Sequence, residues 1–134
     1  MKVFKELTIV TPNKPGKLAQ ALRTLANAGV NLIAIDSSSG YDLNMVRIVT
    51  SDSATARKAL EKIGYNVAES TVLGLTVSDK PGQLARIASL FSKAQVNIEY
   101  MYASAVAYDQ PALVVVHAGD AAAAEKVLRA AKFV

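Results

Sequence analysis

The sequence predicts an α+β fold made of two tandem units, each with the element order β-α-β-β-α-β and an antiparallel sheet. Three observations lead to this prediction. A seven-residue stretch occurs twice, short apolar runs of strand character flank both copies, and segments with helical apolar periodicity lie between those runs. Repetition at a fixed offset indicates a duplicated structural unit. We therefore expect a first unit at residues 1–70 and a second unit at residues 71–134.

The repeated stretch reads Asn-Lys-Pro-Gly-Lys-Leu-Ala at residues 13–19 and Asp-Lys-Pro-Gly-Gln-Leu-Ala at residues 79–85, an offset of 66 residues. A Val-Asn pair follows each copy at the same offset, at residues 30–31 and 96–97. Each copy comes directly after an apolar run and opens a segment with apolar residues at every third or fourth position. The two copies thus mark the same strand-to-helix turn in both units.

The first half contains every element of one such unit. Alternation predicts the strands, apolar stripes predict the helices, Ser51-Asp52-Ser53 caps the second helix, and Gly29 and Gly64 end the two helices. The predicted elements are a strand at 6–11, a helix from 17 to 28, strands at 30–38 and 43–50, a helix from 53 to 63 and a short strand at 65–71. This order is that of the ferredoxin-like unit, in which two helices cover one face of a four-stranded sheet.

The second half repeats this order directly after the first half, and it departs from the first half at a helix end and in its last strand. No turn residue separates the strand at 65–71 from the strand at 71–77, so one nearly continuous strand should join the two units. Gln95 replaces the glycine that ends the matching helix, which requires a left-handed conformation or a different ending. The second unit lacks most of its last strand, and we expect the first unit or another subunit to cover the exposed strand edge.

The two strand-to-helix turns are candidate anion sites. The first N–H groups of a helix have no partner within the helix, and the helix dipole attracts negative charge to them. Gly16 and Gly82 carry no Cβ, so a ligand can approach the backbone, and Pro15 and Pro81 preset the helical φ angle. A carboxylate is the natural small guest. The alternative is that each Pro-Gly pair only makes a tight turn.

These features resemble the ACT domain family. The resemblance rests on the element order, the Lys-Pro-Gly-x-Leu-Ala helix starts and the Val-Asn entry to each second strand, and it covers essentially the whole chain as a stand-alone tandem ACT protein. It implies a non-catalytic regulatory protein that binds an amino acid or another small effector between units. It also implies a homodimer and a regulated enzyme as partner. Residues 35–38 stand where phenylalanine-responsive members have Glu-Ser-Arg-Pro, but the Arg and Pro are missing, so phenylalanine is not implied.

An amino acid needs acceptors for its ammonium group as well as an anion site, and Asn13, Asp79 and Asp36 are candidate acceptors. Tyr100 and Tyr102 line the pocket or cover a subunit interface, and strict alternation places both on the face of Ile98 unless a bulge intervenes. The candidate ligand-binding residues are Asn13, Lys14, Pro15, Gly16, Lys17, Leu18, Asp36, Ser37, Asp79, Lys80, Pro81, Gly82, Gln83, Leu84, Tyr100 and Tyr102.

Composition argues against several other functions. With no Cys and one His, the chain has no conventional triad or thiolate metal site, so we expect no enzyme activity and no cofactor. The net charge of +4 is typical of nucleic-acid binding, but the predicted central strands carry no aromatic residue for base stacking, so no nucleic acid is expected. No apolar run reaches the ~20 residues of a membrane helix and no signal peptide is recognisable, so we expect no membrane and a cytoplasmic protein.

The principal alternative is a protein-interaction or oligomerisation module that binds no ligand. An apolar fraction of 51% and the missing last strand both favour a buried subunit interface. Ligand-dependent thermal stabilisation separates the two functions, because a pure scaffold melts at the same temperature with any amino acid present.

Overall fold

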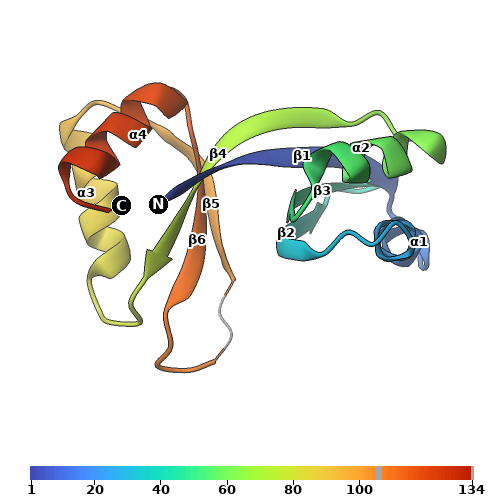
Figure 1. Cartoon of the computed structure of the whole chain (residues 1–134), viewed down its shortest axis with the longest axis horizontal. Coiled ribbons are helices and arrows are strands. Elements are labelled where there is room, and N and C mark those ends of the chain that lie inside the picture. The colour runs from blue at the N-terminus through green and yellow to red at the C-terminus, as the bar shows by residue number, and fades with distance from the viewer. Residues whose placement is uncertain (105–106, 134) are drawn as a thin grey trace. The chain divides into compact units, whose positions relative to one another are not determined.

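The structure, a computed structural model, describes residues 1–104 and 107–133 and divides the chain into two compact units (Figure 1). Lys5–Ser70 form the N-terminal unit, and Met1–Phe4 together with Thr71–Val134 form the C-terminal unit. The division expected at residues 1–70 and 71–134 differs from these units in Met1–Phe4. This short segment groups with the second half of the chain.

The described residues contain four helices and six strands in the predicted order (Figure 1). The helices are α1 (Lys17–Asn27), α2 (Ser53–Lys62), α3 (Gln83–Lys93) and α4 (Ala121–Ala130), and the strands are β1 (Lys2–Pro12), β2 (Leu32–Ser39), β3 (Leu43–Thr50), β4 (Ala68–Val77), β5 (Ile98–Ser104) and β6 (Ala112–Ala118). The predicted α+β fold of tandem ferredoxin-like units is confirmed. None of these helices is long and apolar enough to cross a membrane.

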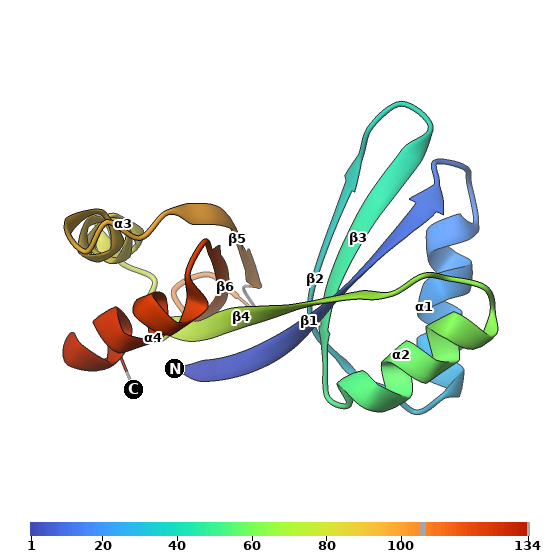
Figure 2. The same ribbon diagram turned by 90° about the horizontal axis from the view of Figure 1, so that it is seen from above.

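The N-terminal unit has its strands in the order β2-β3-β1-β4, with β3 antiparallel to both β2 and β1. Helices α1 and α2 lie side by side on one face of this sheet (Figure 2). Alternation along β1 turns Leu7 and Ile9 toward the helices, where they belong to one core with Leu25 of α1 and Leu60 of α2. The period of two in the strand and the period of 3.6 in the helices therefore bury their apolar residues together.

The C-terminal unit has its strands in the order β1-β4-β6-β5, with β6 antiparallel to both β4 and β5. Helices α3 and α4 cover one face of this sheet (Figure 1). Leu73 and Leu75 of β4 share a core with Val116 of β6, Phe91 of α3 and Leu128 of α4. This core repeats the arrangement of the N-terminal unit with larger side chains at some positions.

The start of β1 occupies the edge of the C-terminal unit beside β4. β1 is the neighbour of β4 in the sheet, Met1 packs against the core of this unit, and the Phe4 ring lies over Gly74. No strand follows α4 in residues 131–133. The start of β1 therefore stands beside β4 in the C-terminal unit, as β4 stands beside β1 in the N-terminal unit.

Both helices of the second repeat end without a glycine. Gln95 and Lys132 have φ angles of 57° and 63°, at the positions where the first repeat has Gly29 and Gly64. The Gln95 side chain donates from Nε2 to the Ser92 carbonyl at 3.2 Å. Of the two endings that the sequence allows for α3, the left-handed one is therefore the one present.

Candidate functional site

The two strand-to-helix turns have the same backbone geometry. Gly16 has φ 89° and ψ −15°, and Gly82 has φ 91° and ψ −8°, a left-handed conformation that glycine adopts without strain. The same hydrogen bonds close both turns: Lys14 N–H to Pro12 O at 2.9 Å and Lys17 N–H to Lys14 O at 3.3 Å in the first, and Lys80 N–H to Ser78 O at 2.9 Å and Gln83 N–H to Lys80 O at 3.4 Å in the second. The duplicated sequence thus folds into duplicated turns.

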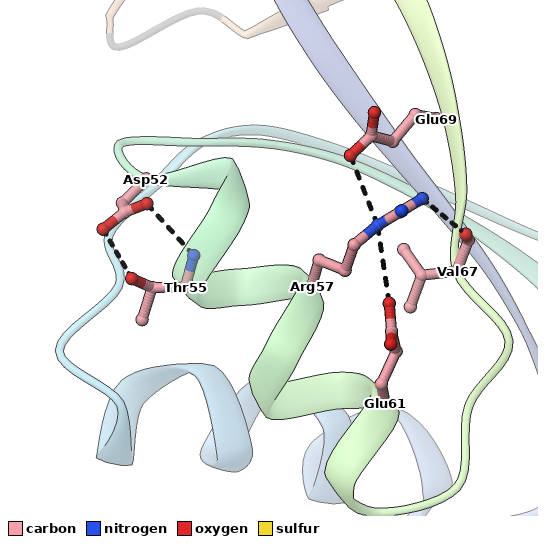
Figure 3. Close-up of polar contacts among 6 residues, drawn as sticks. All are labelled: Asp52, Thr55, Arg57, Glu61, Val67 and Glu69. Carbon is pink, nitrogen blue, oxygen red and sulfur yellow. Dashed lines mark hydrogen bonds and ion pairs between the residues drawn. The ribbon is translucent and has the colours of Figure 1, made fainter.

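The helix starts fall into two classes. The Asp52 side chain accepts a hydrogen bond from Thr55 N–H at 3.1 Å and caps α2 (Figure 3), and the Asp120 side chain accepts from Ala123 N–H at 3.0 Å and caps α4. Helices α1 and α3 begin after glycine, and no described side chain caps either of them. The Lys17 and Gln83 N–H groups already close the turns, so the next N–H groups of α1 and α3 are the ones available to another acceptor, such as a carboxylate.

The first residue of each repeated stretch ties its turn to the neighbouring hairpin. Asn13 donates from its backbone N–H to Asp42 O at 2.7 Å and from Nδ2 to Tyr41 O at 3.1 Å. In the second repeat the bond runs the other way, because Asp109 N–H donates to Asp79 Oδ2 at 2.8 Å. Asn13 and Asp79 therefore hold the turns in place. One carboxylate oxygen of Asp79 accepts the hydrogen bond from Asp109.

A cavity of about 340 Å³ opens at the second turn, within the C-terminal unit. Its volume lies within the range of small-molecule sites. Five of the predicted residues line it, namely Asp79, Lys80, Gly82, Gln83 and Leu84. Carboxylate, ammonium and uncapped helix N–H groups therefore meet at one opening, which suits a small zwitterion.

The sequence did not identify the strand wall of this cavity. Val77 at the end of β4, Ala103 of β5, and Ala112 and Val114 of β6 line it, together with Ser78 and Ala85. Val77 and Ala112 are partners across the two strands, as are Ala103 and Val114. Alternation places Val77, Ala112 and Val114 on the helix-facing side, but Ala103 lies there only because the register of β5 shifts between Ile98 and Tyr100. Only strand pairing shows that these residues meet. The two small alanines leave the space that a larger side chain would fill.

The structure places Tyr100 and Tyr102 on the other face of the sheet. The register shifts between Ile98 and Tyr100, so Ile98 and Met101 both pack against the core while the two tyrosines point away from it. Tyr100 stacks on His117 with ring centroids 4.8 Å apart. The expectation that alternation puts both tyrosines on the face of Ile98 is wrong, because a bulge at Glu99 resets the alternation.

In the first repeat, Asp36 pairs with Arg47 of the neighbouring strand at 3.1 Å, and both side chains are partly buried. Ser37 is exposed and lies on the helix-facing side of β2, because it pairs with the core residue Val46 of β3. The residues of the first turn, Asn13 to Leu18, are exposed or half-buried at the start of α1. Asp36 and Ser37 therefore lie on opposite faces of the strand, and the Asp36 carboxylate has a cationic partner within the fold.

Comparison with known proteins gives the family. The sequence matches the family model of the ACT domain pair over residues 1–133. No curated protein matches the chain significantly.

Among solved structures, protein BT0572 from Bacteroides thetaiotaomicron is similar with a TM-score of 0.90 and 32% identity over 97% of this chain and 89% of that chain. The regulatory subunit of aspartate kinase from Thermus thermophilus, in its ligand-free form, is similar with a TM-score of 0.73 and 19% identity over 98% of this chain and 96% of that chain. The corresponding subunit from Thermus flavus is similar with a TM-score of 0.62 and 20% identity over 97% of this chain and 95% of that chain. With a family match over nearly its whole length and the same fold in these proteins, the chain belongs to the ACT domain pair family.

Proposed function

We propose that this protein is a non-catalytic regulatory module that binds an amino acid at the strand-to-helix turn of its C-terminal unit. The observation that carries the proposal is the cavity of about 340 Å³ beside the uncapped start of α3. The ligand carboxylate accepts hydrogen bonds from the Leu84 and Ala85 N–H groups, which follow the bonded Gln83 N–H in the first turn of α3. The remaining carboxylate oxygen of Asp79 receives the ammonium. Charge-assisted bonds of this kind contribute roughly 1.5–3 kcal/mol each, which supports dissociation constants from about millimolar to micromolar.

The strand wall gives the proposed site its preference among amino acids. Val77, Ala103, Ala112 and Val114 offer an apolar surface opposite the helix start. A ligand whose carboxylate lies at α3 directs its side chain toward this wall. We therefore infer that an amino acid with a small or medium apolar side chain binds here.

The proposed partners follow from the family. The similar aspartate kinase chains are regulatory subunits by name. A regulated enzyme is accordingly the partner that we propose for this chain, with a homodimer in the cytoplasm as the working state. Ligand binding then acts by favouring one arrangement of the regulated complex over another.

A second candidate function is protein association through an apolar surface. Val10, Leu43 and Met45 are exposed on the face of the N-terminal sheet that the helices do not cover, by 47%, 55% and 40%. Exposed apolar residues that gather on one face favour an interaction surface. This function predicts self-association or partner binding that is indifferent to amino acids.

The test is a thermal melt against each common amino acid at millimolar concentration, followed by calorimetric titration of those that stabilise. A ligand at about 100 times its dissociation constant adds about 2.7 kcal/mol. We expect Gly82→Val to lose this stabilisation, because Gly82 lines the cavity and a larger side chain there competes with the ligand for space.

Gly64→Val is the matched control. Gly64 has φ 100° against 91° for Gly82, and neither position has an atom within 4 Å of an added Cβ, so both substitutions impose backbone strain without a clash. The control should keep the ligand response even if it melts lower. Equal loss of the response in both variants, or no response in the unsubstituted protein, would contradict the proposed function.

A further inference from the structure

The two strand-to-helix turns share their backbone geometry but differ in the strand residues beside them. At the second turn, Val77 and Ala112 are partners across β4 and β6, and both line the cavity. At the first turn, the corresponding partners across β1 and β3 are Thr11 and Asn44. Both lie on the helix-facing side, because they alternate with core residues of their strands. Asn44 therefore stands where Ala112 forms part of the cavity wall.

The strand wall of the first turn is closed by its own side chains. Thr11 is fully buried, and solvent reaches neither its Oγ1 nor the Oδ1 of Asn44. The amide group of Asn44 extends beyond the single methyl group of Ala112, so it takes up space toward the helix start that stays open at the second turn. A ligand side chain directed at this wall therefore meets an amide at the first turn and a cavity at the second.

The two turns also differ in charge. At the second turn the repeated stretch contains one acidic and one basic residue, Asp79 and Lys80, whereas at the first turn it contains Lys14 and Lys17 and no acidic residue. Lys17 holds the place of Gln83, which lines the cavity, and the backbone of both turns has the same geometry. A zwitterion thus meets balanced charges at the second turn and only positive charge at the first.

The residue that begins each stretch extends this difference to the ammonium group of a ligand. Asp79 lines the cavity, and its Oδ2 accepts a hydrogen bond from Asp109 N–H. Asn13 is uncharged, and its Nδ2 already donates to Tyr41 O at 3.1 Å. A carboxylate holds an ammonium group more strongly than an amide oxygen does, because the attraction of opposite charges adds to the hydrogen bond.

Folding alone does not select between these two sets of residues. Each unit builds the same antiparallel pairing and the same left-handed glycine turn from its own set. The differences in space and in charge gather at one place in the unit, which is the place where a ligand would lie. They are therefore better explained by a difference in binding than by a difference in folding.

We infer that the chain binds one amino acid, at the turn of Gly82, and that Asn44, Lys17 and Asn13 exclude the same ligand from the turn of Gly16. This inference rests on the proposed function. Ala112 is accordingly the residue that leaves the binding wall open. The first repeated stretch then forms a structural turn only, which is the alternative that the sequence allows for each Pro-Gly pair.

Calorimetric titration of the full chain with valine and with leucine measures the number of sites, and we expect one per chain. Ala112→Asn places the first-turn residue in the second turn and should weaken binding by about 10-fold or more. Asp79→Asn/Gln83→Lys transfers the charges of the first turn and should weaken binding by a similar factor. Asparagine keeps an oxygen for Asp109 N–H, so this second variant tests the inference even if Ala112→Asn does not fold.

The reciprocal variant Asn13→Asp/Lys17→Gln/Asn44→Ala gives the first turn these residues of the second. We expect the number of sites to rise from one to two per chain, with the affinity of the second turn unchanged. A melt without ligand checks that the variant is folded. A folded variant that still binds only one ligand would overturn the inference, because these three residues would then not be what closes the first turn.

Failures of the two proposals are distinguishable. If the unsubstituted chain binds neither amino acid, the proposed function and this inference fall together. If it binds two per chain, or if either folded second-turn variant binds as tightly as the unsubstituted chain, the inference alone is overturned.

Discussion

Single residues decide which helix starts have a side-chain cap and which do not. Asp52 and Asp120 cap α2 and α4 with their carboxylates, whereas Gly16 and Gly82 leave α1 and α3 without a side-chain acceptor. The capping residue is recognisable from the sequence because Asp favours the N-cap through a local bond to the next turn. The open starts are equally local features, since glycine has no side chain with which to cap.

The Asp52 cap makes a residue-scale prediction about pH. Hydrogen bonds from the Thr55 hydroxyl and backbone N–H lower the pKa of Asp52 from its ordinary value of 3.8. A lowered folded-state pKa means that the cap stabilises the protein above pH 3.8 and that this stabilisation is lost as the pH falls through the folded-state value. We expect Asp52→Ala to melt lower than the unsubstituted protein at neutral pH and the difference to shrink in acid.

Thermal melts at neutral pH and in steps below pH 4 check this prediction. Asp52→Asn is the control, because asparagine caps a helix without titrating in this range. A difference between Asp52→Ala and the unsubstituted protein that stays constant in acid would contradict the charged cap.

At the scale of elements, Arg57 joins α2 to the start of β4 (Figure 3). It donates from Nη2 to the Val67 carbonyl at 2.9 Å and forms ion pairs with Glu69 at 3.2 Å and with Glu61 at 3.5 Å. Two of these partners come after the end of α2, so the arginine fixes the path of the chain into β4. Partly exposed ion pairs each contribute little to the free energy of unfolding, whereas loss of the hydrogen bond leaves the Val67 carbonyl without its donor.

We expect Arg57→Ala to lower the free energy of unfolding by about 1–2 kcal/mol, because it removes the donor to Val67 as well as the ion pairs. Arg129→Ala is the matched control. Among the described residues, the ion pair of Arg129 is with Glu125, one turn away on α4, and such a pair contributes about 0.3–0.5 kcal/mol. Urea unfolding of both variants measures the difference, and equal losses would show that the link to β4 adds nothing.

At the scale of the whole molecule, the first residues of the chain belong to the unit formed by the second repeat. The segment Met1–Phe4 belongs to the C-terminal unit, although the rest of β1 belongs to the N-terminal unit. Gly74 accommodates this arrangement, because a Cβ there would lie 2.9 Å from Phe4 Cδ2. The second repeat is therefore completed by residues far away in the sequence.

We expect Phe4→Ala to destabilise the C-terminal unit by about 2 kcal/mol, because it removes a half-buried ring from above Gly74. Val3→Ala, at an exposed neighbour, should cost well under 1 kcal/mol. Gly74→Ala should be destabilising alone and less so in the Phe4→Ala background, since the clash then disappears. Chemical unfolding of the four variants gives the coupling, and additive effects would contradict the contact.

Local pattern determined much of this protein from its sequence alone. Two copies of one stretch, strand alternation and helix periodicity predicted the tandem β-α-β-β-α-β order, and the ACT resemblance followed from it, because each signal depends on neighbours in the chain. The residues of the two turns were predicted for the same reason.

Tertiary structure decided the features that depend on partners distant in sequence. The bulge before Tyr100 reversed the face of two predicted site residues, and the cavity wall formed where Ala103 and Ala112 met from different strands. The start of β1 completed the second sheet, and strand pairing brought Thr11 beside Asn44. The sequence lists all of these residues, but only long-range pairing determines which of them touch, because a single shift in register moves a side chain to the opposite face.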